Sequence, residues 1–342
     1  MVLEVKNLKA HIDTPDGVVK AVDGVSFTIE PGETIGIVGE SGSGKSVLAH
    51  SIMQLNPKPP TFYPQGEIVF EGKKLLQLKE KELQKIRGNE IAMVYQDPMS
   101  SLNPVFKIGD QLIEAILTHH HMPKRKARQR AIELLTDVGI PDPEKRFDAY
   151  PHQFSGGMRQ RVLIAIALAC NPKILIADEP TTALDVTIQA QILELMKRIQ
   201  EKYGTAIIII SHDLGVIAQM AEKVLVMYSG RIVEKGNVED IFYHTSMPYT
   251  WSLLRSLPRI DSETRNRLLS IEGQPPNLVH PPSGCNFHPR CPFATEQCKT
   301  MYPQLTKRSG DHYAACILSE LEFKEAKKRL ENREQEGRQK HV

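Results

Sequence analysis

The fold is decided by residues 39–46, which read Gly39-Glu40-Ser41-Gly42-Ser43-Gly44-Lys45-Ser46. An apolar run at 34–38 precedes this stretch, and a helical pattern at 47–55 follows it. Glycines placed between a buried strand and a helix allow backbone N–H groups to wrap a phosphate, with the helix dipole behind them. Lys45 is expected to reach the β- and γ-phosphates of ATP, and the Ser46 hydroxyl to ligate Mg²⁺. The order of strand, loop and helix therefore predicts a P-loop NTPase core.

A second strand end supplies the acidic residues that such a core needs. Residues 174–177 and 207–210 are continuous apolar runs, typical of strands buried on both faces of a parallel sheet. The first run leads into Asp178 and Glu179. Asp178 is expected to hold Mg²⁺ through water, and Glu179 to polarise the attacking water as the catalytic base.

The rest of the chain predicts additions to this core. Residues 1–30 alternate apolar and polar residues around a turn at 15–17, which indicates an antiparallel β-subdomain. Residues 106 to 165 carry apolar residues at helical spacing, which indicates a helical insertion. Beyond residue 247 prolines are frequent and periodicity is weak, and residues 323–340 read as a charged helix or tail. We expect an ATPase domain at 1–250, with its helical subdomain at about 98–165, and a C-terminal domain at 251–342.

Bulk composition narrows the function classes. The 342 residues have a formal net charge of +2, which gives no basic footprint for a nucleic-acid partner. The N-terminus lacks an apolar signal-peptide core. The longest apolar run, at 162–170, is shorter than the roughly 20 residues that span a bilayer. We therefore expect a soluble cytoplasmic protein whose membrane role comes through a partner.

A third motif points to a particular kind of P-loop ATPase. It reads Phe154-Ser155-Gly156-Gly157-Met158-Arg159-Gln160. A Ser-Gly-Gly before a helix is another anion-binding N-terminus. One chain has no need of a second γ-phosphate cradle, whereas two chains arranged head to tail do. Here the sequence resembles the ABC ATPase family, whose signature is usually Leu-Ser-Gly-Gly-Gln. This chain departs at the two ends and keeps the Ser-Gly-Gly core.

The family pattern continues in order along residues 1 to about 245. Gln96 stands at the Q-loop position, where the resemblance implies contact with Mg²⁺ and ATP and sensing of the γ-phosphate. Asp185, in Ala183-Leu184-Asp185, stands at the D-loop, and His212 is the switch histidine. The resemblance implies ATP contacts at Ser155, Gly156, Gly157, Asp185 and His212, and catalytic roles for Glu179, His212 and Gln96. The aromatic residue that usually stacks on adenine is replaced by His11 and Ile12, either of which could pack on the base.

Four of the five cysteines lie in the C-terminal stretch, at Cys285, Cys291, Cys298 and Cys316. Their spacing matches neither a zinc finger with paired C-x2-C nor a common ferredoxin run. A small domain with few apolar residues needs a cross-link to stabilise its fold, and a bound metal can provide one. From the residues alone an iron–sulfur cluster, zinc, a mixed site with His280, His288 or His312, and free thiols or disulfides stay open. Cys170 is expected to be a core residue.

Two further stretches narrow the resemblance to the oligopeptide/dipeptide importer ATPases. They are residues 96–104, which read QDPMSSLNP, and residues 283–292, which read SGCNFHPRCP. The resemblance implies a [4Fe-4S] cluster on the four C-terminal cysteines, with zinc as the alternative. The fold class expected is thus α/β: a P-loop NTPase core with an N-terminal antiparallel β-subdomain, an inserted α-helical subdomain and a small loop-rich C-terminal metal or cluster domain.

The resemblance also implies partners and a location. They are two integral membrane permease subunits, a second ATPase subunit forming a homo- or heterodimer, and an extracytoplasmic peptide-binding protein acting indirectly. The chain would lie on the cytoplasmic face of the cell membrane as a peripheral protein. A nickel or other small-solute importer ATPase is one alternative. Another is a soluble ABC ATPase outside transport, although such proteins usually carry coiled-coil insertions or two cassettes. A regulatory subunit with an inactive site is disfavoured by Glu179 and His212.

Overall fold

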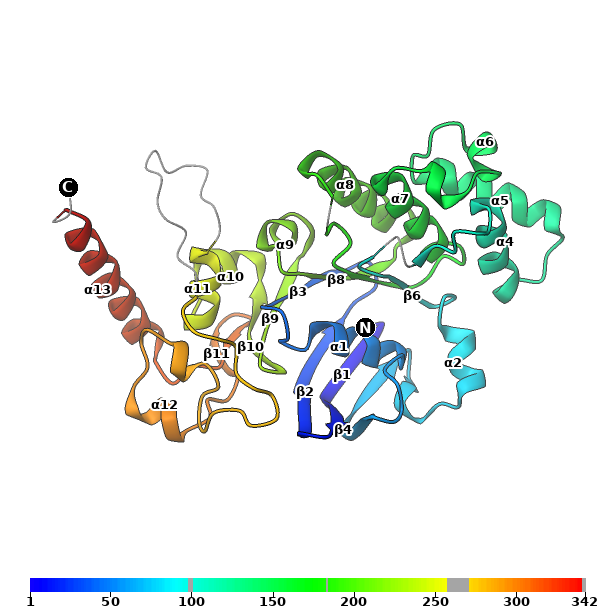
Figure 1. The fold of residues 1–342 in the computed structure, drawn as a ribbon. Helices are drawn as coiled ribbons and strands as arrows, with labels where there is room; N and C mark the ends of the chain where they lie inside the picture. The colour runs from blue at the N-terminus through cyan, green and yellow to red at the C-terminus, as the bar shows by residue number, and fades with distance from the viewer. Residues whose placement is uncertain (98–100, 183, 257–270, 340–342) are drawn as a thin grey trace.

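The chain forms two β-sheets with helices packed around them (Figure 1). The computed structural model describes residues 1–342 except 98–100, 183, 257–270 and 340–342. The start of the expected helical subdomain, part of the 96–104 stretch and Ala183 of the D-loop thus lie outside the described residues. Along the described ranges, no helix is both long and apolar enough to cross a membrane.

The larger sheet carries the apolar strands predicted from the sequence. Its order is β11 (Thr306–Ser309), β12 (His312–Ala314), β10 (Arg231–Asn237), β9 (Lys223–Tyr228), β3 (Thr34–Val38), β8 (Ala206–Ser211), β7 (Ile174–Asp178), β6 (Ile91–Val94). The strands from β9 to β6 are parallel, and every residue of β3, β7 and β8 is buried. Parallel strands end at the same edge of a sheet, so the residues that follow β3, β6, β7 and β8 lie together.

The smaller sheet is the predicted antiparallel β-subdomain. Its order is β2 (Gly17–Ile29), β1 (Leu3–Thr14), β4 (Thr61–Phe70), β5 (Lys73–Lys74). The turn expected at 15–17 is confirmed, since β1 ends at Thr14 and β2 begins at Gly17. Buried and exposed residues alternate along β2, because one face of this sheet packs on the core.

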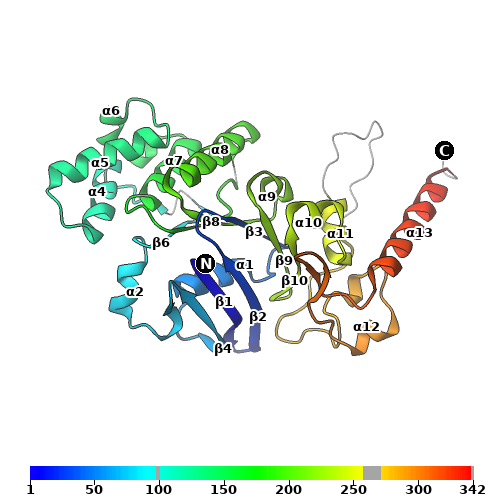
Figure 2. The same ribbon diagram turned by 180° about the vertical axis from the view of Figure 1, so that it is seen from behind.

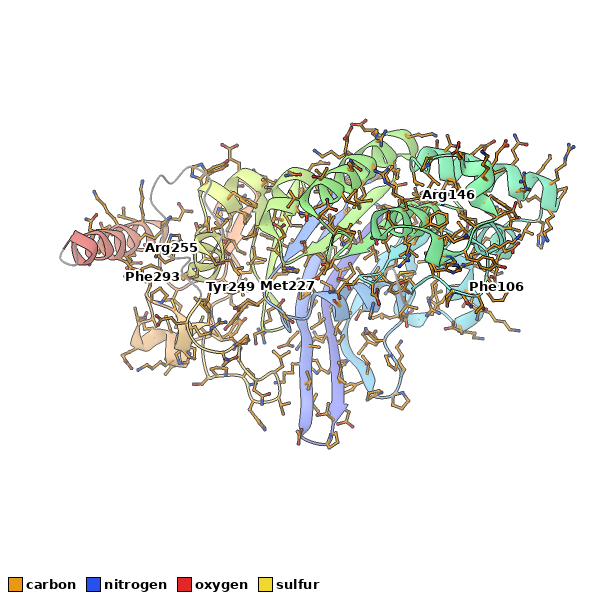
Figure 3. The ribbon with its side chains drawn as sticks, turned by 45° about the horizontal axis from the view of Figure 1, so that its top comes forward. Phe106, Arg146, Met227, Tyr249, Arg255 and Phe293 are labelled. Carbon is orange, nitrogen blue, oxygen red and sulfur yellow. The ribbon has the colours of Figure 1, made fainter. Side chains whose placement is uncertain are left out.

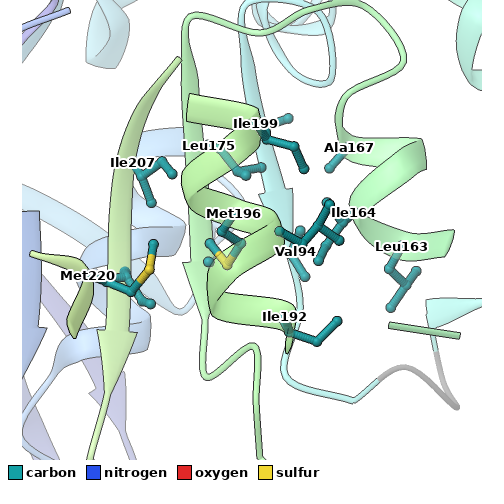
Figure 4. Close-up of a cluster of buried hydrophobic side chains, with 14 of the residues drawn as sticks. Val94, Leu163, Ile164, Ala167, Leu175, Ile192, Met196, Ile199, Ile207 and Met220 are labelled. Carbon is teal, nitrogen blue, oxygen red and sulfur yellow. The ribbon is translucent and has the colours of Figure 1, made fainter. Parts of the chain in front are cut away.

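Helices cover both faces of the parallel strands. Helix α1 (Lys45–Met53) lies on one face, and α7 (Gly156–Ala167), α8 (Val186–Tyr203) and α9 (Leu214–Met220) lie on the other (Figures 1 and 2). In Figure 4, Met196 of α8 and Ile164 of α7 meet Leu175 of β7 in a buried cluster. The predicted helical insertion contains α4 (Ile108–His119), α5 (Lys124–Asp137) and α6 (Pro143–Phe147) before α7. Among the described residues before the C-terminal region, helix α2 (Glu80–Ile86) and two 3₁₀ turns, Leu75–Gln77 and Pro151–Gln153, are further helical elements.

The C-terminal region is attached to the larger sheet. Its helices are α10 (Val238–Tyr243), α11 (Pro248–Arg255), the 3₁₀ turn His288–Arg290, α12 (Glu296–Thr300) and α13 (Glu320–Gln339). Strand β12 pairs antiparallel with β10, with Glu234 opposite Ala314, and β11 pairs with β12. Strands from the end of the chain thereby extend the sheet that carries the P-loop. The boundary expected at residue 250 stays a prediction.

Candidate functional site

The P-loop joins the end of β3 to the start of α1. Gly44 has φ +102°, and a Cβ at this position would lie 2.0 Å from the carbonyl oxygen of Ala21, so only glycine fits. Lys45 Nζ donates to the carbonyl oxygens of Gly39, at 2.8 Å, and Glu40, at 2.9 Å. The ammonium group is therefore held against its own loop.

Two acidic residues lie close enough to act on the charge of Lys45. Burial lowers the pKa of the Lys45 ammonium, and the carboxylates of Glu179 and Asp178 work in the opposite direction, as does that of Glu40 within the loop itself. A buried cation facing two acids is the arrangement expected where a strongly charged ligand and its counter-ion are bound.

Asp178 and Ser46 meet as the sequence predicts for a metal site. Burial raises the pKa of Asp178, which also accepts a hydrogen bond from the side chain of Ser46. Asp178 Oδ1 is buried and has no hydrogen-bond partner among the described residues. Oxygen ligands in a small donor set suit Mg²⁺, which keeps several waters and binds through one or two protein oxygens. The residues therefore fit the ion.

Glu179 is the centre of a hydrogen-bond network that joins three strand ends. Its Oε2 accepts from Gln96 Nε2 at 2.9 Å and from the hydroxyl of Thr182 at 2.9 Å. Its Oε1 lies 3.0 Å from His212 Nδ1. The structure thus brings together Gln96, Glu179 and His212, which stand 83 and 33 positions apart in the chain.

The same network sets the protonation state of Glu179. Burial on its own would raise the pKa of this carboxyl. Hydrogen bonds from His212 and Thr182, with the positive charge of Lys45, outweigh burial and lower the pKa below its ordinary value. Glu179 is therefore ionised at neutral pH and can accept a proton.

The signature motif begins a helix, as its sequence predicts. Ser155 is the N-cap of α7, and its side chain accepts from the backbone N–H of Met158 at 3.4 Å. A Cβ on Gly157 would come within 2.6 Å of Ile188 in α8. Ser155 and Gly156 are exposed. Helix α7, which they precede and begin, lies on the face of the sheet opposite α1 (Figure 1).

The other predicted ATP contacts have local partners. Asp185 is the N-cap of α8 and accepts from the N–H of Ile188 at 2.9 Å. His11 lies 3.7 Å from Asp23 and edge-on to Phe62, and burial lowers its pKa. Ile12 pairs with Val19 and Thr61 inside the smaller sheet. These contacts leave the choice between His11 and Ile12 for adenine a prediction.

The predicted iron–sulfur cluster is wrong, and so is its zinc alternative. Across the described ranges, no group of three or more His, Cys, Asp or Glu side chains is arranged to hold a metal ion. Cys285, Cys291, Cys298 and Cys316 instead border one cavity of about 20 Å³. Such a space holds about one water molecule, far less than four iron and four sulfur atoms.

The environment of the cysteines gives the physical reason. Phenylalanine, proline and alanine side chains share the cavity wall, so the thiols pack as core residues. Burial raises the pKa of Cys291 to about 12 and that of Cys316 to about 11, whereas a metal binds the thiolate. Two of the histidines have partners of their own: His312 Nε2 lies 2.8 Å from Glu234, and His288, which also borders the cavity, has its Nδ1 2.9 Å from the carbonyl oxygen of Cys285.

Glu40 of the P-loop is held by two residues that the sequence did not predict for the site. Arg290 binds its carboxylate with two nitrogens, and the Tyr249 hydroxyl accepts from its backbone N–H. Both residues come from the C-terminal region, and no local pattern around them indicates the contact. The available signal was Glu40 itself, because a carboxylate inside a phosphate-binding loop needs a cation beside it.

This chain resembles solved structures of ATP-binding cassettes. A dimeric structure of the cassette MJ0796 in a post-hydrolysis state, bound to ADP and phosphate, superposes with a TM-score of 0.62 at 29% identity, covering 69% of this chain and 98% of that one. CbiO1 from Clostridium perfringens, part of an ABC transporter complex, gives 0.61 at 30% identity, covering 70% and 90%. Residues 22–182 match the ABC transporter family. The P-loop, the acidic strand end and the signature helix thus define an ABC-type ATPase, which hydrolyses ATP.

The remainder of the chain gives the narrower assignment. Residues 233–298 match the C-terminal region of oligopeptide/dipeptide transporters. The oligopeptide transport ATP-binding protein OppD of Bacillus subtilis is 55% identical over 91% of this chain and 87% of its own length. The dipeptide transport ATP-binding protein DppD of Lactococcus lactis is 55% identical over 92% and 89%. The chain belongs to this family of ATP-binding subunits of oligopeptide and dipeptide ABC transporters.

Proposed function

We propose that this chain hydrolyses ATP to drive the import of di- or oligopeptides through membrane permeases. The observation that carries the chemistry is the meeting of Gln96, Glu179 and His212 at the strand ends beside the P-loop. The match at 233–298 and the names of the relatives support a peptide as the transported solute.

The residues divide the work of hydrolysis among them. Backbone N–H groups of the P-loop, apart from that of Glu40, which donates to Tyr249, and the ammonium of Lys45 bind the phosphates. Ser46 and Asp178, with Gln96, would hold Mg²⁺, which when bound neutralises phosphate charge and orients the γ-phosphate. Glu179 orients the attacking water and accepts its proton. The new bond forms between the water oxygen and the γ-phosphorus, and the bond from that phosphorus to the oxygen of ADP breaks.

His212 and Gln96 act on the same carboxylate from two sides. The hydrogen bond between His212 Nδ1 and Glu179 fixes one carboxylate oxygen, and Gln96 Nε2 fixes the other. Gln96 follows β6 and precedes the helical insertion, so a change at the γ-phosphate reaches those helices through it. This path is our proposal for coupling hydrolysis to the permeases.

A complete site needs two chains. Helix α7, which begins at the Ser-Gly-Gly of residues 155–157, lies on the sheet face opposite α1, and this supports a role of these residues at the P-loop of a second ATPase subunit. We propose a head-to-tail dimer in which Asp185 lies near the same interface. Two integral membrane permeases, with a peptide-binding protein on the far side, would complete the transporter on the cytoplasmic face of the membrane.

Reconstituted transport tests this function. The chain, assembled with its permease subunits and binding protein in vesicles, should accumulate a labelled tripeptide only when ATP is supplied. Assemblies that carry Glu179→Gln should bind ATP without accumulation. ATP-dependent uptake of nickel with no uptake of peptide would contradict the proposal and support the small-solute alternative.

A further inference from the structure

Glu40, the second residue of the P-loop, forms an ion pair with Arg290 of the C-terminal region. Arg290 Nη1 donates to Glu40 Oε2 at 2.6 Å, and Nη2 donates to Oε1 at 2.8 Å. The two residues stand 250 positions apart. The Arg290 side chain is 5% exposed and that of Glu40 is 23% exposed. Two parallel N–H···O bonds fix both distance and orientation, which a single ion pair does not.

The backbone of Glu40 is held from the same side. The hydroxyl of Tyr249, in α11, accepts from the N–H of Glu40 at 2.8 Å. Tyr249 is fully buried, with its ring centroid 4.4 Å from Tyr228 and 5.3 Å from Phe287. In Figure 3 it lies between Phe293 of the C-terminal region and Met227 of β9. An acceptor on a packed ring cannot follow the loop if the loop moves.

Arg290 is itself fixed in place. Its Nε donates to the carbonyl oxygen of Glu272 at 3.0 Å, and its Nη1 lies 3.4 Å from the hydroxyl of Tyr228. The guanidinium therefore joins three segments that are far apart in the chain: the P-loop, the end of β9 and the loop at Glu272. Because these bonds already fix the Arg290 side chain, it loses little conformational freedom when it binds Glu40.

Glu40 connects Arg290 and Tyr249 to the phosphate-binding Lys45. The carbonyl oxygen of Glu40 accepts from Lys45 Nζ at 2.9 Å. One residue thus receives Arg290 on its carboxylate, donates to Tyr249 from its N–H and holds Lys45 with its carbonyl. Arg290 also neutralises a carboxylate that would otherwise repel the triphosphate.

We propose that Arg290 and Tyr249 are positioning residues of the ATP site, through which the C-terminal region holds the P-loop in its phosphate-binding shape. The proposal rests on the ATPase activity and needs no statement about the transported solute. Peptide transport and this role therefore succeed or fail in separate experiments.

The test is a set of KM and kcat measurements for ATP hydrolysis on the intact chain. Arg290→Gln should raise the KM for ATP about tenfold or more, within the usual range of coupling between two sites. Arg290→Lys keeps the charge and loses the paired geometry, so it should give a smaller rise. Tyr249→Phe keeps the ring packing and removes one acceptor, so it should raise the KM about threefold.

A double variant separates this role from a loss of stability. Glu40→Gln removes the negative charge that Arg290 neutralises. The pair Glu40→Gln/Arg290→Gln should therefore show a lower KM than Arg290→Gln alone. A residue that only stabilises the fold would lower the melting temperature and the active fraction, while the KM of the active molecules stayed the same.

Arg87→Gln is the matched control. Arg87 forms an ion pair with Glu80 at 2.6 Å and binds the carbonyl of Met53, at the end of α1 far from the phosphates. Its loss should reduce stability with the KM for ATP unchanged. Wild-type KM values in both Tyr249→Phe and Arg290→Lys, with only the melting temperature lowered, would overturn the proposal.

Discussion

At the scale of single residues, Glu179 combines an unusual backbone with a crowded side chain. Its φ of +49° is in the left-handed region, which non-glycine residues rarely adopt. Such a conformation costs about 1–3 kcal/mol and persists only where the surroundings hold it. Bonds from Gln96, Thr182 and His212 converge on its carboxylate. These bonds are the surroundings that hold the residue in this conformation.

Glu179→Gln should keep ATP binding and lower kcat by about a hundredfold or more. The amide has the same shape but accepts no proton from water. The ATP-bound dimer should become long-lived, which size-exclusion chromatography with ATP measures. Glu71→Gln is the control, because Glu71 pairs at the surface with Lys173. Wild-type turnover of Glu179→Gln would remove Glu179 as the base.

At the scale of elements, the C-terminal strands are joined to the larger sheet by a buried polar cluster. Glu234 of β10 is wholly buried and accepts from the hydroxyl of Thr245 at 2.8 Å and the N–H of Ser246 at 2.6 Å. His312 of β12 lies 2.8 Å away across the strand pair. Buried polar groups of this kind are costly when a partner is removed.

His312→Ala should therefore lower the free energy of unfolding by about 2–4 kcal/mol. The loss removes the imidazole partner from a buried oxygen of Glu234, which keeps the N–H of Ser246. Urea unfolding measures the change, and Lys299→Ala should cause no measurable loss because its pair with Glu296 is exposed. Equal stability of His312→Ala and the wild type would show that this cluster does not hold β12.

At the scale of the whole molecule, Asp23 and Arg231 connect the two sheets. Arg231 of β10 donates to Asp23 Oδ2 of β2 through Nε at 3.1 Å and Nη2 at 2.5 Å. Burial raises the pKa of Asp23, but the charge and hydrogen bonds of Arg231 outweigh it and hold the pKa below its ordinary value. The ionised carboxylate is the form that stabilises the folded state.

The lowered pKa of Asp23 predicts that the protein loses stability in acid. A carboxyl whose pKa is lowered by folding stabilises the folded state fully above its unfolded-state pKa of about 3.9. This stabilisation is lost as the pH falls toward the pKa of the folded state. Asp23→Asn should lower stability at pH 7 and flatten the decline below about pH 4. Urea unfolding at several pH values measures both effects. A decline as steep as that of the wild type would exclude Asp23 as a contributor.

The assembled dimer supplies the remaining prediction at this scale. Ser155→Arg should abolish hydrolysis while ATP affinity of the monomer stays within about twofold of wild type, a change of under 0.5 kcal/mol. The arginine would fill the space where the partner's phosphate is expected. Binding of a fluorescent ATP analogue to dilute protein measures monomer affinity, and Ser155→Ala controls for loss of the helix cap. Loss of monomer binding would contradict the model of a signature acting on a second subunit.

The sequence by itself determined the elements whose information is local. Each of three features is a single continuous stretch of sequence: the P-loop, the acidic end of β7 and the turn at 15–17. Neighbouring residues are enough to specify a strand, a glycine-rich loop and a helix. Family resemblance added Gln96 and His212, and the structure places both on Glu179.

Tertiary structure alone decided which distant side chains meet. No periodicity links Arg290 to Glu40 across 250 positions, or β12 to β10, because these contacts arise when the chain closes large loops on a packed core. The cysteine spacing, read with the resemblance, predicted a cluster. Packing instead placed apolar side chains around the four thiols. Local pattern specifies a segment and its chemistry, but whether several groups converge depends on the shape and dielectric of the interior that forms around them.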